Sequence, residues 1–191
     1  MMYSLKAIAS PKTADGFWLF EQPEHDIFIR VYNMPSPAAY HALLQQCLQE
    51  ILASPNAAIN IVKTEHGKPY LADHKLVFNV SHSQQWLAVA WSSSQTNIGV
   101  DIEHAERQQQ VLAISKRYFH ANEQVTAEQN WLHTWTRKEA ILKAHGLGLR
   151  IKLVELDTTA TTVEHEQLGC WSVATIAHPS FVLSVSWPAL Q

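Results

Sequence analysis

Three acidic residues and one lysine stand in two stretches of the sequence that could bring them into a single site. Asp101 and Glu103 lie two residues apart in Gly99–Glu103, where apolar residues alternate with the others as in a β-strand. Residues two apart on a strand share a face, so these carboxylates project together. Glu139 and Lys143 lie four residues apart in a stretch typical of a helix, which makes them neighbours on one helix face. If strand and helix pack together, three oxygen donors and an ammonium converge, a combination that suits Mg²⁺ and a phosphate.

Each of these features also has an ordinary structural explanation. Two acids on a strand face are usually solvated, and a helical Glu139 beside Lys138 and Lys143 is normally part of an exposed ion pair. Lys68 follows a glycine in a turn, and His82 between two serines could simply cap the end of a strand. The order of the motifs along the chain, rather than any one of them, favours a catalytic site.

The positive charges of the chain lie in the same region as the three acids. Although the formal net charge is −3, eleven of the fourteen Lys and Arg fall within positions 63–152, where they face eight Asp and Glu. A basic surplus around carboxylates suits an anionic substrate bridged by a metal ion. The overall balance does not predict a nucleic-acid-binding protein.

The elements that must position these residues follow from periodicity. In the first half we predict a helix from Ser36 to about Ala53 and four strands, at 26–32, 57–63, 76–79 and 86–91. In the second half the strand with Asp101 is followed by two helices and three strands, at 111–119, 130–145, 151–157, 171–176 and 181–187. Both halves thus hold helices followed by strands. This order predicts an α+β fold of two similar subdomains, residues 1–95 and 96–191, divided at a polar stretch.

The composition predicts a globular protein without a membrane association. Hydrophobic residues make up 47% and charged residues 16% of the 191 positions, no apolar run reaches transmembrane length, and the first residues lack a signal-peptide pattern. A cytoplasmic location is therefore expected. The two cysteines, Cys47 and Cys170, match no metal or disulfide spacing, and we predict that both are small buried residues.

The motifs, taken together, resemble the 4′-phosphopantetheinyl transferase superfamily in its larger monomeric type, which activates peptide and polyketide synthetases. The resemblance rests on five stretches between about Tyr40 and Leu149: Gly67–Tyr70, Phe78–Ser83, Gly99–Glu103, Lys116–Phe119 with Glu123, and Trp135–Leu149. Each is short, but their joint order is specific. The resemblance implies an α+β fold of two similar subdomains in a pseudo-twofold arrangement, with coenzyme A bound between them.

The resemblance also implies a reaction. A serine of an apo acyl or peptidyl carrier protein would attack the β-phosphate of coenzyme A, giving holo carrier protein and adenosine 3′,5′-bisphosphate. Mg²⁺ would be held by the three acids, Asp101, Glu103 and Glu139, and Lys143 would stabilise the leaving oxygens. Glu123 matches the glutamate usually considered as the general base, and a metal-bound water is the alternative.

The remaining contacts to coenzyme A are expected from basic side chains. Lys68 and His82 match family positions that contact its phosphates, and Lys138 would be a further contact. The chain departs from the family ahead of Tyr40, where a basic cluster that helps to bind the 3′-phosphate is mostly missing. Arg30, Lys68 and His82 are the candidates that remain for this phosphate.

Two other functions fit parts of the pattern. The same carboxylates could serve another Mg²⁺-dependent phosphotransferase or a hydrolase that cleaves pyrophosphates without a protein acceptor. The chain could also be a non-catalytic module that binds carrier proteins. A pure binder has no need for the three acids together with Lys143, so their joint presence favours the transferase.

Overall fold

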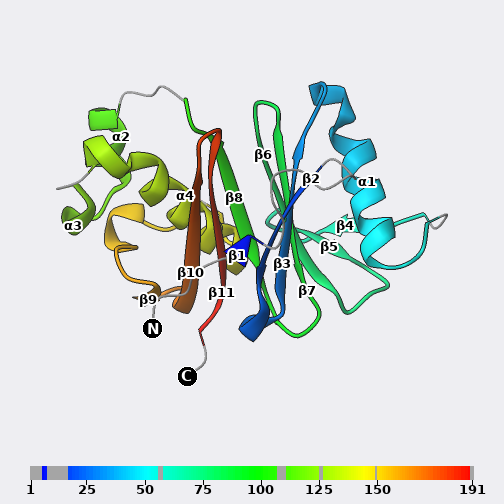
Figure 1. Ribbon diagram of the computed structural model, residues 1–191. Coiled ribbons are helices and arrows are strands. Elements are labelled where there is room, and N and C mark those ends of the chain that lie inside the picture. Colours follow the sequence, from blue (N-terminus) through cyan, green and yellow to red (C-terminus); the bar gives the residue numbers. More distant parts are fainter. Residues whose placement is uncertain are drawn as a thin grey trace.

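Two antiparallel sheets lie face to face at the centre of the protein, and helices cover their outer faces (Figure 1). The computed structural model describes residues 6–7, 17–55, 58–106, 111–124, 127–148 and 150–189. Two positions named above lie outside this part of the chain: the first residue of the strand predicted at 57–63, Ala57, and the last residue of the stretch Trp135–Leu149. The α+β class predicted from the sequence is confirmed. The pseudo-twofold relation between the halves stays a prediction.

The first sheet has the strand order β1-β2-β3-β7-β6. Its strands are antiparallel and span Lys6–Ala7, Phe17–Gln22, Ile27–Asn33, Trp86–Ser92 and Val77–Ser83 in that order. Strand β3 shows how the sequence builds the layers, because Ile27, Ile29 and Val31 alternate onto the central face and are fully buried.

Helix α1, Tyr40–Ile51, covers the other face of the first sheet with Leu44, Cys47 and Leu48. A 3₁₀ helix, η2, spans Pro37–Ala39 and begins where we predicted the helix to begin, although the Ser36 side chain makes no capping hydrogen bond. Another, η1, spans Pro23–His25. Two short strands, β4 (Ile61–Lys63) and β5 (Pro69–Leu71), form a separate hairpin. Strand β4 falls within the strand predicted at 57–63, and β5 follows the turn that contains Lys68.

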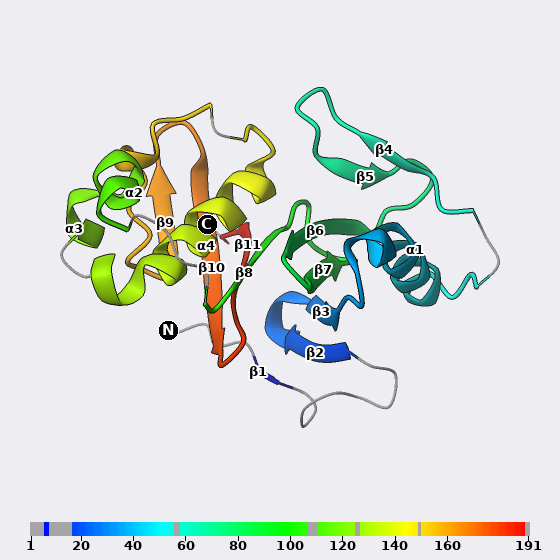
Figure 2. The same ribbon diagram turned by 90° about the horizontal axis from the view of Figure 1, so that it is seen from above.

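The second sheet has the order β8-β11-β10-β9, with strands at Gly99–His104, Phe181–Pro188, Gly169–His178 and Thr162–His165. Helix α4 (Ala127–His145) covers its outer face, and helices α2 (Val111–Tyr118) and α3 (Ala121–Gln124) pack against α4. Seen from above, α1 and the α2–α3 pair lie at opposite ends of the molecule (Figure 2). No helix in the described ranges is long and apolar enough to cross a membrane.

The predicted strand at 151–157 is wrong. This segment contains a 3₁₀ helix, η3, over Leu153–Glu155, and the strand before β10 is β9. Leu153 and Leu156 are buried in a cluster with helix α4, while their carbonyl oxygens accept hydrogen bonds from Lys138. A side chain therefore binds the backbone groups that a strand would have used.

Gly99 determines how closely helix α4 approaches the strand with the acidic pair. A Cβ at this position would lie 2.1 Å from the carbonyl oxygen of Ala140 and 2.2 Å from the backbone nitrogen of Ala144. These are backbone atoms of the last turns of helix α4, so they cannot rotate away as a side chain could. The missing side chain lets α4 pack directly on β8, which brings Asp101 and Glu139 onto adjoining elements.

We expect Gly99→Ala to destabilise the protein by at least about 3 kcal/mol, because the new methyl group overlaps helix backbone. Urea unfolding monitored by tryptophan fluorescence measures this loss. Gly169→Ala is the matched control: its added Cβ meets open space, and only its positive φ of 80° opposes the change, at about 1–2 kcal/mol. Equal losses in the two variants would contradict the close contact.

Candidate functional site

Strands β6 and β8 lie side by side where the two sheets meet (Figure 1). Side chains of β6 bind the backbone of β8. The backbone N–H groups of Val100, Ile102 and His104 donate hydrogen bonds to side-chain oxygens of β6. Their acceptors are Asn79 Oδ1 at 3.0 Å, Ser81 Oγ at 3.4 Å and Ser83 Oγ at 3.3 Å, respectively. We call the side chains of Asn79, Ser81 and Ser83 the side-chain ladder.

The acidic pair on β8 is buried rather than solvated. Asp101 is 5% exposed and Glu103 6% exposed, and both lie on the face of β8 that carries Gly99 and meets helix α4. Ser81 Oγ donates to Asp101 Oδ1 at 2.9 Å, and Ser83 Oγ donates to Glu103 Oε2 at 2.7 Å. These acids are therefore not on a solvated surface, and their hydrogen-bond partners offset the free-energy cost of burying carboxylates.

Lys143 connects the two halves at the acidic pair. Its Nζ donates to Asp101 Oδ1 at 2.6 Å and to Ser81 Oγ at 2.8 Å, while the side chain remains 30% exposed. Glu139, one helical turn earlier, is half-buried and lines a cavity of about 260 Å³ together with Lys143. The structure therefore brings Lys143 of the predicted helix into contact with Asp101 of the predicted strand.

Lys68 reaches the same cavity from the turn between β4 and β5. Its Nζ donates to the backbone oxygen of Ala144 at 2.6 Å and to Asn97 Oδ1, so the turn is tied to the end of helix α4. Burial lowers the pKa of the Lys68 ammonium to about 8. A second cavity of about 380 Å³ shares Lys68 and is also lined by His74, Lys75 and His145.

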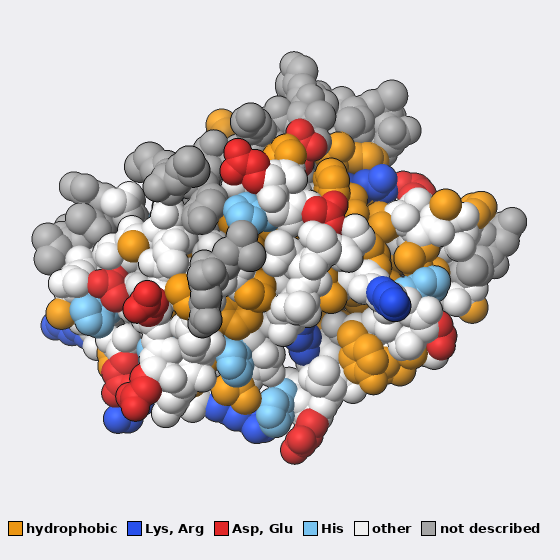
Figure 3. Space-filling model, turned by 90° about the horizontal axis from the view of Figure 1, so that it is seen from below, with side chains coloured by type: hydrophobic (Ala, Val, Ile, Leu, Met, Phe, Trp, Pro, Cys, Tyr) orange, Lys and Arg blue, Asp and Glu red, His pale blue; other side chains and the backbone are white. Residues whose placement is uncertain are grey.

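The positive surplus predicted for the central segment is not gathered on the face drawn in Figure 3. Acidic, basic and histidine side chains are interspersed there among the described residues. Two of the segment's cations, Lys68 and Lys143, lie instead in the cavity of about 260 Å³, which residues of both halves line. A cavity with two ammonium groups and one carboxylate suits a phosphate-containing ligand.

The carboxylate oxygens of the acidic pair indicate how a metal ion could be held. Asp101 Oδ2 is buried and has no hydrogen-bond partner, so one oxygen of the acidic pair is left for a cation. Within the described ranges, however, no group of three or more His, Cys, Asp or Glu side chains is arranged to hold a metal ion. The carboxylate oxygens of Asp101, Glu103 and Glu139 are ligands of the kind that Mg²⁺ prefers. The described residues do not by themselves form a complete metal site.

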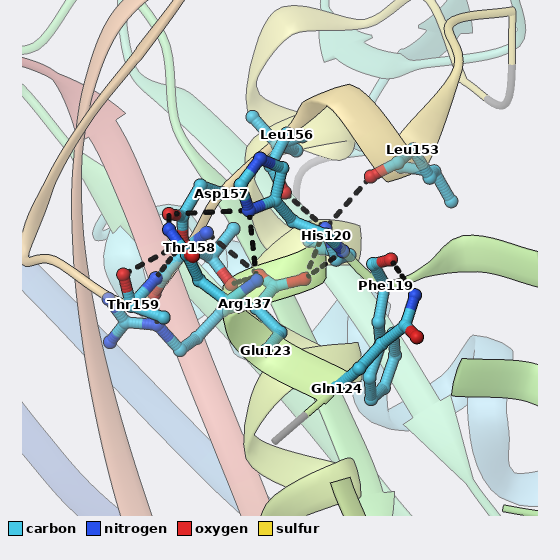
Figure 4. Close-up of polar contacts among 12 residues, drawn as sticks. Phe119, His120, Glu123, Gln124, Arg137, Leu153, Leu156, Asp157, Thr158 and Thr159 are labelled. Atoms are coloured by element: carbon cyan, nitrogen blue, oxygen red, sulfur yellow. Dashed lines mark hydrogen bonds and ion pairs between the residues drawn. The ribbon is translucent and has the colours of Figure 1, made fainter. Parts of the chain in front are cut away.

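Glu123 and Lys138 form a buried ion pair, and neither residue lines this cavity. The two side chains are 1% and 0% exposed, and Lys138 Nζ lies 2.8 Å from Glu123 Oε2. Figure 4 shows Glu123 with its neighbours His120 and Thr158. The other Glu123 oxygen accepts hydrogen bonds from the backbone N–H and the hydroxyl of Thr158, at 2.8 and 2.7 Å, and the backbone N–H of His120 also donates to the carboxylate. Burial lowers the pKa of Lys138, and the Glu123 charge opposes that shift.

This geometry bears on two of the assignments made from the sequence. Lys138 has no exposed surface and binds two carbonyl oxygens besides Glu123, so it does not contact a phosphate of coenzyme A in this structure. Both oxygens of Glu123 have partners in the same buried cluster, and its role as a general base stays a prediction. The pair holds η3 and the segment after it against helix α4.

Arg30 and His82 are also placed by the structure. Arg30 forms an ion pair with Glu50 of α1 at 2.5 Å and lies over the ring of Phe17, which gives it a structural role instead of the expected phosphate contact. His82 is exposed on β6, and its ring contacts that of Tyr40 at 5.2 Å between centroids. His82 therefore stays open to a ligand.

The sequence interpretation missed the side-chain ladder and Asn97. A signal was present, because polar residues occupy alternate positions of β6 on the face that turns toward the second sheet. The sequence interpretation singles out His82 in that motif and gives no role to its neighbours Ser81 and Ser83. Polar residues on the buried face of a strand indicate side chains with specific partners.

The site is thus a buried carboxylate pair and two lysines between the halves of a small α+β protein. Comparison with known proteins agrees with this class. The family profile of the 4′-phosphopantetheinyl transferase superfamily matches residues 97–185, and that of the 4′-phosphopantetheinyl transferase N-terminal region matches residues 29–94.

Curated relatives carry the same description. The 4′-phosphopantetheinyl transferase gsp of Aneurinibacillus migulanus is 32% identical over 139 residues, covering 66% of this chain and 56% of the relative. HetI of Nostoc sp. is 31% identical over 71% of this chain and 62% of its own length, and AcpT of Salmonella typhi is 31% identical over 65% of this chain and 70% of its own length. The chain belongs to the 4′-phosphopantetheinyl transferase superfamily. It spans about half the length of several of the curated relatives that it matches.

Proposed function

We propose that this protein transfers 4′-phosphopantetheine from coenzyme A to a serine of an apo acyl or peptidyl carrier protein. One observation supports the proposal most: the Lys143 ammonium joins Asp101 of the second half to Ser81 of the first half, beside a cavity that Lys68 also lines. The buried acids and the two lysines provide for a metal ion and for the pyrophosphate of coenzyme A together. We further propose that the protein acts as a monomer in the cytoplasm.

The residues of the cavity have distinct parts in this reaction. Lys68 and Lys143, which both line this cavity, bind the anionic pyrophosphate. The serine oxygen forms a bond to the β-phosphorus, and the bond from that phosphorus to the bridging oxygen breaks, so the bridging oxygen leaves with adenosine 3′,5′-bisphosphate. Lys143, which is already within hydrogen-bond distance of two site oxygens, stabilises the negative charge on the departing oxygen.

Asp101, Glu103 and Glu139 would hold Mg²⁺, which when bound neutralises part of the pyrophosphate charge. Asp101 would contribute Oδ2, its unpartnered oxygen. Since Glu123 is occupied in its ion pair with Lys138, we propose a water molecule of the site as the acceptor of the serine proton.

The direct test is incubation of the protein with coenzyme A, Mg²⁺ and a panel of apo carrier proteins, read by intact mass. We expect one carrier protein to gain the mass of a single phosphopantetheine, and a carrier with its acceptor serine changed to alanine to gain none. Omission of Mg²⁺ with a chelator should also prevent the gain. Release of phosphopantetheine without a carrier would indicate a hydrolase, and carrier binding without any mass change would indicate a binding module.

Lys68 predicts a specific dependence on pH. Its pKa of about 8 means that the ammonium is charged below this pH and neutral above it, and only the charged form attracts pyrophosphate. We therefore expect kcat/KM for coenzyme A to fall as the pH rises through about 8. Lys68→Arg, whose guanidinium stays charged, should remove this decline, whereas Lys63→Ala, which changes an exposed lysine, should leave it unaltered. An unchanged decline in Lys68→Arg would contradict the assignment.

A further inference from the structure

The side-chain ladder lies where the edge strand of one sheet adjoins the edge strand of the other. Strand β6 is the last strand in the order of one sheet, and β8 is the first in the order of the other. Successive N–H groups on one side of β8, those of Val100, Ile102 and His104, point toward β6 and are met there by side chains. Buried backbone donors must find partners, so the ladder supplies what a neighbouring strand would supply.

Two residues of the ladder, Ser81 and Ser83, also donate hydrogen bonds to the acidic side chains of β8. Ser81 Oγ has three polar neighbours: the Lys143 ammonium at 2.8 Å, the N–H of Ile102 at 3.4 Å and Asp101 Oδ1 at 2.9 Å. The first two can only donate, so they occupy the hydroxyl as an acceptor and leave its single proton for Asp101. The orientation of this proton is therefore determined by the contacts around it.

Ser83 repeats the arrangement two residues further along β6. Its Oγ accepts from the N–H of His104 at 3.3 Å and donates to Glu103 Oε2 at 2.7 Å. Asn79 provides the third rung through Oδ1 alone, opposite Val100. Each acid of the pair on β8 thus receives one hydroxyl from β6, and that same hydroxyl binds the N–H of the residue that follows the acid.

We propose that Ser81 and Ser83 are positioning residues that orient the carboxylates of Asp101 and Glu103 toward the cation and hold them there only while the two sheets are docked. The inference rests on the proposed function, because it assigns the carboxylates to Mg²⁺. Groups that hydrogen-bond a metal's ligands commonly change metal affinity about 10- to 100-fold when removed. The ladder would thereby make cation binding depend on side chains from the half of the protein that carries neither acid.

The primary variant is Ser83→Ala, because Ser83 is only partly buried and its loss should leave no closed cavity. Mg²⁺ binding to the protein with coenzyme A present, measured by calorimetry, is expected to weaken about 10- to 100-fold. Ser83→Thr, which keeps the hydroxyl, should restore most of the affinity. Ser81→Ala should weaken binding at least as much, because that hydroxyl also binds Lys143.

Ser92→Ala is the matched control. Ser92 is a fully buried serine on the neighbouring strand β7, and its hydroxyl contacts Asp26 and the backbone of Ser94 and Gln95 instead of the acidic pair. It should lower thermal stability about as much as Ser83→Ala and leave Mg²⁺ affinity unchanged. Amide hydrogen exchange provides a local readout, since the N–H of His104 should exchange faster in Ser83→Ala and not in Ser92→Ala.

The outcomes separate this inference from the proposed function. Wild-type Mg²⁺ affinity in Ser83→Ala, failure of Ser83→Thr to recover a lost affinity, or an absence of Mg²⁺ binding in the unaltered protein would each overturn the positioning role. If the unaltered protein binds Mg²⁺ and the variants behave as expected, but no carrier protein is modified, the positioning role stands and the proposed transfer reaction is the part that fails.

Discussion

Asp101→Asn is expected to lower kcat/KM for phosphopantetheine transfer by at least about 100-fold while the protein remains folded. Asparagine has nearly the same shape as aspartate and can still accept the hydrogen bond from Ser81. The substitution removes the negative charge of the carboxylate, which lies 2.6 Å from the Lys143 ammonium. It also removes the unpartnered carboxylate oxygen, Oδ2, that is available to a cation. Both losses act on the groups that face the pyrophosphate, so the chemical step should be affected most.

The measurement is steady-state transfer to a carrier protein that the unaltered enzyme modifies, at several Mg²⁺ concentrations. Asp73→Asn changes an exposed aspartate and serves as the control, with transfer expected to remain at the wild-type rate. Thermal unfolding of both variants excludes a loss of fold as the explanation. Near-normal transfer by Asp101→Asn in saturating Mg²⁺ would show that the acidic pair is not part of the catalytic site.

Lys138→Met is expected to destabilise the protein by about 3–5 kcal/mol, because the Glu123 carboxylate would be left buried without its cation. The carbonyl oxygens of Leu153 and Leu156 would also lose their donor. Changing both partners, as Glu123→Leu with Lys138→Met, should cost less than the sum of the single changes, because no isolated charge remains. Urea unfolding of the four proteins measures the coupling between the two side chains.

A surface ion pair in the same region provides the comparison. Lys152 and Glu155 lie 3.2 Å apart, but their side chains are 79% and 54% exposed. Removing this pair should change stability by no more than about 1 kcal/mol. If Lys138→Met proves as mild as Lys152→Ala, the buried pair is not what holds η3 against helix α4.

The sequence predicted best those parts of the fold that depend on local periodicity. The strand at Gly99–His104 and the helix ending at His145 are as expected, because their apolar residues recur with the period of the element that they form. The segment from Ile151 shows where this reasoning ends. Its apolar residues alternate as in a strand, but Lys138 binds its carbonyl oxygens. A local sequence pattern does not indicate a hydrogen-bond partner that lies outside the segment.

The same distinction holds within the site. The approach of Asp101 and Lys143 could be predicted, since spacing places each on a definite face and the two elements pack together. Lys138 could not be assigned from spacing, because residues adjacent on a helix point about 100° apart and the sequence does not show which direction is buried. The role of Arg30 could not be predicted either, because the sequence does not show which face of its strand meets a ligand. In the structure its side chain turns to α1 and pairs with Glu50.

The core that the two sheets share also limits how the protein can admit a bulky substrate. Side chains such as Ile29 of β3 and Val185 of β11 belong to one buried cluster, so a hinge motion that separated the halves would expose apolar surface at about 25 cal/mol per Å². The β4–β5 hairpin is a two-stranded sheet of its own, and its turn lines both cavities. Its outward displacement would break the contacts of Lys68 with Asn97 and Ala144 and expose Leu71, which is buried in the cluster beneath α1, but it would leave the hydrogen bonds of both large sheets intact. We therefore expect substrate exchange to proceed by displacement of this small hairpin while the body of the protein stays closed.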